Sequence, residues 1–171
     1  MLPSFHRLTL SALRVGALVC AVLSACAATT ALESQKKPLA ARLARIYILR
    51  PGALCGAAVT ATVKINGLDV GAVATNSYLS VDRPPGRYKI YVSLWGELGK
   101  NEHEIEVAAG RTYYYAINMH GTAVAAAGTV IFFDGPKVGR SVGQSNLLSG
   151  GYLAEVDAAQ AAAAMSRMRP P

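Results

Sequence analysis

Two features are missing from the start of this 171-residue sequence: acidic side chains, and an apolar run long enough to cross a membrane. The first 14 residues are basic and contain no acid, and residues 15–23 are apolar or small without interruption. A transmembrane helix needs about 20 apolar residues, so this run is too short to span a bilayer. A basic start, a short apolar middle and the small residues Ser24 and Ala25 are typical of a secretory signal peptide.

The signal-like segment ends in Leu23-Ser24-Ala25-Cys26. These four residues resemble the lipobox of bacterial lipoproteins. The resemblance implies that a signal peptidase cleaves between Ala25 and Cys26, and that Cys26 is lipidated on its thiol and often on its new amine. Two or more acyl chains anchor a protein stably where one does not. Ala27 stands where an aspartate would retain such a protein in the inner membrane. The resemblance therefore implies an outer-membrane protein of the bacterial cell envelope that faces the periplasm.

Cysteine and histidine are both scarce. Of three cysteines, Cys20 would leave with the signal peptide and Cys26 would carry lipid, so Cys55 remains alone and no intramolecular disulfide can form. We expect Cys55 to be a small packing residue, because no nearby His or Lys would lower its pKa. His103 and His120 show no metal-ligand spacing. No metal and no cofactor beyond the covalent lipid is expected.

The chain carries a formal charge of +7. Removal of residues 1–25 takes away two arginines and no acid, which leaves 15 basic and 10 acidic side chains, a charge of +5. An exported protein meets no chromosome, so nucleic acid is not expected as a partner, and anionic lipid or wall polymers fit better. Lys36, Lys37, Arg42 and Arg45 follow the anchor. They either add attraction to an anionic surface or belong to an ordinary solvated linker.

The remaining pattern predicts an all-β domain. Val59 to Ile65 runs into Asn66-Gly67, a strong hairpin signal. Residues 87–95 alternate, with Tyr88, Ile90, Val92 and Leu94 on one face. Short alternating runs separated by turns favour a mostly antiparallel sandwich of immunoglobulin- or transthyretin-like type.

Composition divides the chain into four segments. The Ala-rich stretch from Leu153 to Met168, acidic at its start and basic at its end, predicts a C-terminal helix. Polar residues without strand alternation precede the domain and predict a flexible tether. The predicted segments are a signal peptide (1–25), a lipidated cysteine and tether (26–43), a β-sandwich (44–150), and a helix with a basic, Pro-ending tail (151–171).

Several short motifs follow one another in a recognisable order: Ala44 to Pro51, Val63 to Gly67 with Val70-Gly71, Pro85 to Tyr88, and Ala109 to Tyr115. In order and spacing they resemble bacterial lipoproteins of the domain-of-unknown-function family 2846, which is related in pattern to PEGA-type sandwiches. The resemblance implies a β-sandwich and an envelope location. It brings no established activity and no catalytic residues.

The sequence offers little chemistry. Gly139-Arg-Ser-Val-Gly143 matches a G-x-S-x-G string, but glycine and proline separate it from the preceding strand, and no histidine follows His120. No catalytic residue is therefore predicted, and the protein is not expected to be an enzyme.

One constellation suggests binding. Cations beside aromatic side chains suit glycans or anionic polymers. The predicted binding face consists of Arg87, Lys89, Tyr91, Trp95 and, from an adjacent strand, Tyr114. Alternatively, these aromatics only cover the sheet or pack under the C-terminal helix. The expected function is a non-catalytic interaction or structural module that docks an envelope protein partner; the alternative is a binder of glycan or anionic lipid through this face.

Overall fold

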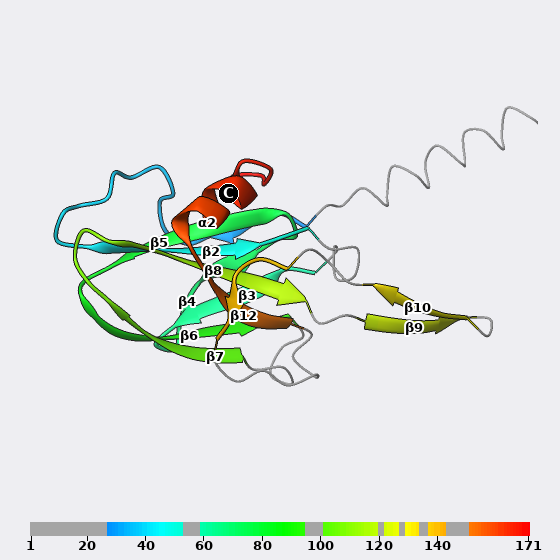
Figure 1. Ribbon diagram of the computed structural model, residues 1–171. Coiled ribbons are helices and arrows are strands. Elements are labelled where there is room, and N and C mark those ends of the chain that lie inside the picture. Colours follow the sequence, from blue (N-terminus) through cyan, green and yellow to red (C-terminus); the bar gives the residue numbers. More distant parts are fainter. Residues whose placement is uncertain are drawn as a thin grey trace, which may run out of the picture.

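The computed structural model describes residues 27–52, 59–94, 101–119, 122–126, 129–133, 137–142 and 151–171. Within these residues the chain forms two five-stranded sheets, a separate two-stranded hairpin and one short helix. The sheets are layered, and the helix α2 (Ala158–Met165) covers the outer face of one of them (Figure 1). The predicted all-β sandwich with a C-terminal helix is confirmed.

The first sheet, sheet A, is antiparallel throughout. Its spatial order is β1 (Thr30–Ala31), β4 (Leu68–Val73), β3 (Ala61–Ile65), β6 (Gly86–Ser93) and β7 (Asn101–Val107). The turn between β3 and β4 has Asn66 at φ 50° and Gly67 at φ 80°. Two successive positive φ angles define the tight hairpin turn that Asn-Gly favours, so this prediction is confirmed.

The second sheet, sheet B, is mixed. Its spatial order is β11 (Arg140–Ser141), β12 (Gly151–Val156), β8 (Thr112–Met119), β2 (Ala44–Arg50) and β5 (Ser77–Arg83). The central strands β2 and β8 are parallel, and the other pairs are antiparallel. The hairpin β9 (Thr122–Ala126) and β10 (Thr129–Phe133) lies beyond one end of the sandwich (Figure 1).

The core lies between the sheets, where alternate residues of each strand are removed from water. Ile46 and Ile48 of β2 and Ile90 of β6 are fully buried. Arg87 and Lys89 belong to the other alternating set of β6 positions from Ile90, and both are exposed. The predicted alternation along this strand is therefore confirmed from Arg87 to Val92, but Ser93, which was predicted to lie on the polar face, is buried.

The predicted start of the C-terminal helix is wrong. Residues 151–156 form β12, which pairs with β8 along its whole length, and the helix begins only after Asp157. Asp157 has an extended backbone, and its Oδ1 accepts a hydrogen bond from the backbone N–H of Gln160 at 2.8 Å, so it caps the helix. The sandwich therefore extends past residue 150.

The predicted flexible tether is also corrected. β1 pairs with the edge strand β4, and the Leu32 N–H donates to the Val70 carbonyl at 3.1 Å. Farther on, Glu33 forms an ion pair of 2.7 Å with Arg83. Backbone and side-chain bonds together hold this segment across the edges of both sheets. The physical reason is that β4 and β5 would otherwise leave backbone groups unpaired at these edges.

The segment runs from one end of the sandwich to the other. At one end, Thr29 Oγ1 donates to Ser77 Oγ at 2.8 Å and accepts from the Ala74 N–H at 2.9 Å. We call this the Thr29 end. At the opposite end, the Lys37 carbonyl accepts from Arg45, whose guanidinium also forms a bidentate pair with Asp82 at 2.7 and 2.9 Å.

The C-terminal tail returns to the Thr29 end. The Arg169 N–H donates to the Asn76 carbonyl at 2.9 Å, and Ser77 Oγ donates to the Arg169 carbonyl at 2.9 Å. Asn76 also donates to the Arg167 carbonyl at 3.3 Å. One turn, between β4 and β5, therefore fixes both the start of the described chain and its tail.

Candidate functional site

The predicted binding face is only partly assembled. Arg87, Lys89 and Tyr91 alternate on β6 and share the outer face of sheet A. Trp95 lies outside the described residues. Tyr114 does not join them, because its strand β8 belongs to sheet B, whereas β6 has β3 and β7 as its neighbours.

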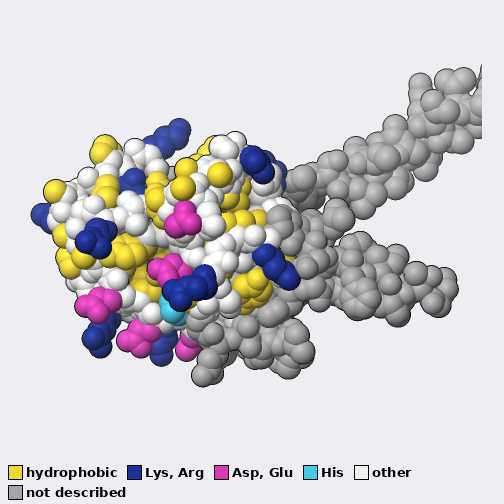
Figure 2. Space-filling view, viewed as in Figure 1, with side chains coloured by type: hydrophobic (Ala, Val, Ile, Leu, Met, Phe, Trp, Pro, Cys, Tyr) yellow, Lys and Arg dark blue, Asp and Glu magenta, His cyan; other side chains and the backbone are white. Residues whose placement is uncertain are grey.

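The cations of this face are matched by carboxylates. In the β6–β7 register, Arg87 lies opposite Glu106 and Tyr91 opposite Glu102. Ion pairs of 3.7 Å join Arg87 to Glu106 and Lys89 to Glu102. Figure 2 shows basic and acidic side chains interspersed along the lower edge of the view. Such a ladder leaves little net positive potential for a polyanion.

A third cation lies next to Tyr91. Lys64 of β3 lies with its Nζ 5.9 Å from the centre of the Tyr91 ring and 3.8 Å from Asp69. The cation therefore occupies an aromatic surface that a sugar ring would need for stacking. The cations on the outer face of sheet A are thus already paired with carboxylates and an aromatic ring of the same face.

Tyr114 instead packs under the helix. Its ring stacks on that of Tyr47 with a centroid distance of 5.3 Å and an interplanar angle of 8°, and Tyr78 meets Tyr47 edge-on at 6.1 Å. This aromatic cluster packs beside Ala161 and Met165 of α2. Burial raises the pKa of Tyr114. The alternative prediction, that the aromatic side chains pack under the C-terminal helix, is therefore confirmed for Tyr114.

His103 lies at a rim of the core, on the same face as Ile105, as the alternation of β7 predicts. Its ring centre is 5.8 Å from that of Tyr115. Burial lowers the pKa of His103, and the charge of Glu155 opposes that effect; burial also raises the pKa of Tyr115. Sequence reasoning missed the proximity of Glu155, because no local pattern links positions so far apart.

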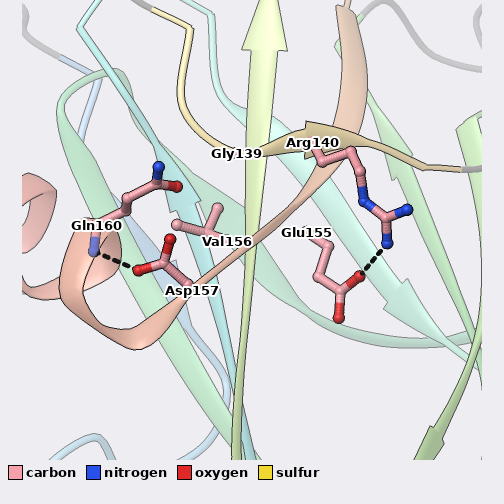
Figure 3. Close-up of a pocket in the computed structure, with 6 residues that line it drawn as sticks. All are labelled: Gly139, Arg140, Glu155, Val156, Asp157 and Gln160. Carbon is pink, nitrogen blue, oxygen red and sulfur yellow. Dashed lines mark hydrogen bonds and ion pairs between the residues drawn. The ribbon is translucent and has the colours of Figure 1, made fainter.

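A surface pocket of about 480 Å³ lies where β11, β12 and the start of α2 meet (Figure 3). Its lining residues are Gly139, Arg140, Glu155, Val156, Asp157 and Gln160. Arg140 and Glu155 pair at 3.2 Å, and Asp157 faces the Gln160 N–H that it caps (Figure 3). Arg140 and Glu155 are thus engaged with each other, and Asp157 is engaged with the backbone at the start of α2.

The serine of the G-x-S-x-G string is part of the same edge. Ser141 belongs to the two-residue strand β11, opposite Ala154, and is exposed. A nucleophile elbow needs a strand, a sharp turn and a helix around its serine. An exposed edge strand does not supply that geometry.

Residues 40–130 match a sequence family described only as "Protein of unknown function (DUF2846)". The match covers more than half of the 171 residues. The chain belongs to this family. Neither the curated proteins nor the solved structures include a significant match. The DUF2846 region takes in β2 through β9, and the strands β11 and β12, the helix α2 and the segment before residue 40 lie outside it.

The DUF2846 region contains a buried cation that sequence reasoning missed. Arg50 is 1% exposed, and its Nη1 donates to the carbonyls of Val59 and, at 3.1 Å, Val73. Burial lowers its pKa to about 10. Arg50 thereby joins the end of β2 to the segment before β3 and to β4. The buried guanidinium of Arg50 therefore holds these segments together at the Thr29 end.

Two negative findings apply to the described residues. No group of three or more His, Cys, Asp or Glu side chains is arranged to hold a metal ion in that part of the chain. No helix there has the length and apolar character to cross a bilayer. Ala25, Cys26 and Cys55 lie outside these residues, so the predicted cleavage and lipidation sites rest on the sequence.

Proposed function

We propose that this DUF2846 protein is a bacterial envelope lipoprotein, anchored through acyl chains on Cys26 at the periplasmic face of the outer membrane. We further propose that its sandwich is a non-catalytic module that docks an envelope protein partner. The signal-like segment and Leu23-Ser24-Ala25-Cys26 support the anchor.

The observation that carries the proposal is the fixed path of the chain after Cys26. Thr29 is bound to Ser77 and Ala74 only three residues beyond the predicted lipid site. Three residues span at most about 10 Å. A lipid on Cys26 would therefore hold the sandwich close to the bilayer in a restricted orientation. Such an arrangement suits a protein that presents a fixed surface to a partner.

An open sheet edge supports a protein as that partner. β1 has two residues, so the pairing on the outer side of β4 ends with the hydrogen bond between Leu32 and Val70 in the described structure. Leu68 of β4 is 72% exposed and Leu32 is 63% exposed. A partner strand added beside β4 would use its backbone groups and cover these leucines.

The alternative function, binding of glycan or anionic lipid through Arg87, Lys89, Tyr91 and Trp95, has less support. Its two described cations are each paired with a glutamate at 3.7 Å. Binding a polyanion would require these pairs to be broken.

The anchor is tested with Cys26→Ser in the full chain. We expect loss of labelled fatty acid, retention of the longer precursor and a changed membrane fractionation. Cys55→Ser is the matched control and should be processed and lipidated normally. Equal lipidation of the Cys26→Ser protein would disprove the anchor.

Docking is tested separately by photocrosslinking in intact cells. A photoreactive residue at Leu68 should give a discrete higher-mass product, whereas the same residue at Glu104, an exposed site of β7 on the outer face of sheet A, should not. Products at Glu104 but not at Leu68 would favour the alternative face.

A further inference from the structure

We propose that the Thr29 end of the sandwich is itself a membrane-contact surface, which uses Arg167, Arg169 and the hairpin β9–β10 to bind anionic phospholipid head groups. The inference rests on the proposed anchor at Cys26. It adds a second, protein-based contact with the same bilayer.

The first step is proximity. Ser77 Oγ accepts from Thr29 and donates to the Arg169 carbonyl, so one hydroxyl links the start of the described chain to its basic tail. Arg167 is held next to it through Asn76. With Cys26 at most about 10 Å of chain from Thr29, both arginines lie near the predicted lipid site.

The second step is charge. Arg167 and Arg169 are exposed, and no acidic side chain pairs with either of them among the described residues. Arg169 directs one Nη2 bond of 3.1 Å to the Thr75 carbonyl and keeps further N–H donors. Guanidinium groups bind phosphate in a bidentate manner. Each cation close to an anionic bilayer strengthens association about fivefold.

The basic residues that the sequence places after the anchor do not serve this purpose. The chain carries Lys37 to the opposite end of the sandwich, and Arg45 is engaged with Asp82 there. Sequence proximity to Cys26 is therefore misleading, and the tail, more than 130 residues away, is closer in space.

The third step is the hairpin. β8 runs parallel to β2, so its last residue, Met119, lies at the same end of the sandwich as Arg50 and Ser77. β9 begins three residues after Met119. Figure 1 shows β9–β10 beyond the end at which the described chain begins. In the register, Phe132 pairs with Ala123, and Ile131 pairs with Val124. Both alternating sets of positions thus contain apolar residues.

A separate two-stranded hairpin is marginally stable in water, so a contact along its strands would stabilise it. It cannot cross the hydrocarbon core, because its outer backbone groups would stay unpaired there. Immersion at the depth of the head groups satisfies both conditions. We therefore expect a shallow contact that combines apolar burial with arginine–phosphate pairing.

The test uses the full lipidated protein with Cys55→Ala and a single spin-label site. Ala125→Cys places the label in the hairpin, and Ala109→Cys places it in the exposed turn at the opposite end. The protein is reconstituted into phosphatidylcholine vesicles with or without phosphatidylglycerol. With phosphatidylglycerol, we expect the Ala125 label to be more accessible to oxygen than to a water-soluble nickel chelate, and the Ala109 label to show the reverse.

Charge reversal supplies the matched comparison. Arg167→Glu combined with Arg169→Glu should return the hairpin label to water, as should high salt. Lys36→Glu combined with Arg42→Glu changes the charge equally at exposed sites outside the proposed contact and should have no effect. A water-accessible Ala125 label in the protein without charge reversals, with a confirmed acyl group on Cys26, would overturn this inference and leave the anchor intact. An unmodified Cys26 would overturn both.

Discussion

Gln35 and Ser80 are joined by three hydrogen bonds. The Ser80 N–H and hydroxyl donate to Gln35 Oε1 at 2.6 and 3.0 Å, and Gln35 Nε2 donates to the Ser80 carbonyl at 2.9 Å. A side-chain amide thus pairs with the edge of β5 as a neighbouring strand would. It closes an edge that would otherwise present free backbone groups.

We predict that Gln35→Ala loosens residues 31–37. The change leaves the Ser80 N–H without its partner, which costs about 1–3 kcal/mol when the group is buried, as Ser80 is. Hydrogen exchange should rise at Ser80, and urea unfolding should shift to lower concentration. Ser34→Ala, at an exposed neighbouring position, should change neither measurement. Unchanged exchange at Ser80 would show that the segment does not protect this edge.

A second prediction concerns Gly71, which has φ +142° and faces β1. A Cβ at this position would collide with the Thr30 carbonyl oxygen. Gly71→Ala should therefore displace β1 and make residues 27–37 sensitive to protease. Gly52→Ala is the control, because its Cβ would meet Asn76 at an ordinary 3.8 Å. Equal protease resistance of the two variants would contradict the assigned path.

How well the sequence predicted each element depends on whether its signal is local or comes from pairing with a distant segment. Asn66-Gly67 and the alternation of residues 87–92 are local, and both were confirmed. The Ala-rich composition after Gly151 favoured a helix, but pairing with β8 makes residues 151–156 a strand. Tertiary pairing outweighed intrinsic preference there.

The sites were harder to predict than the strands. Alternation placed Arg87 and Lys89 on one face correctly, but it holds no information on which strands are neighbours. Tyr114 was therefore assigned to the wrong sheet. The burial of Arg50 and the docking of Gln35 depend on contacts between distant segments, for which one sequence contains no signal.

A third prediction uses His103. Burial holds its pKa in the folded protein below the value of about 6.5 expected in the unfolded chain. The unfolded chain therefore binds more protons below this pH, and the stability contribution of His103 is lost as the pH falls through that window. His103→Gln should make the free energy of unfolding less sensitive to acid, as measured by urea titrations at several pH values. Glu104→Gln, at an exposed site of the same strand, is the control for a nearby charge change. An unchanged slope would mean that His103 titrates normally in the fold.

The last prediction compares two tyrosines that are both half-buried. Tyr114 stacks on Tyr47 and packs in the cluster beneath α2, so Tyr114→Ala should remove apolar contacts and an aromatic pair. We expect a loss of about 2–3 kcal/mol in urea unfolding. Tyr91 has Lys64 over its ring on the open face of sheet A, so Tyr91→Ala should cost less than about 1 kcal/mol.

The same pair of variants also separates packing from binding. If the outer face of sheet A holds a ligand, Tyr91→Ala should lower binding to purified wall or lipopolysaccharide fractions at nearly unchanged stability. If that face is only a solvated ion-pair ladder, as the pairs of Arg87 and Lys89 suggest, binding should not depend on Tyr91. We expect the second result. Similar unfolding losses for the two variants would contradict the assignment of Tyr114 to the layer beneath the helix.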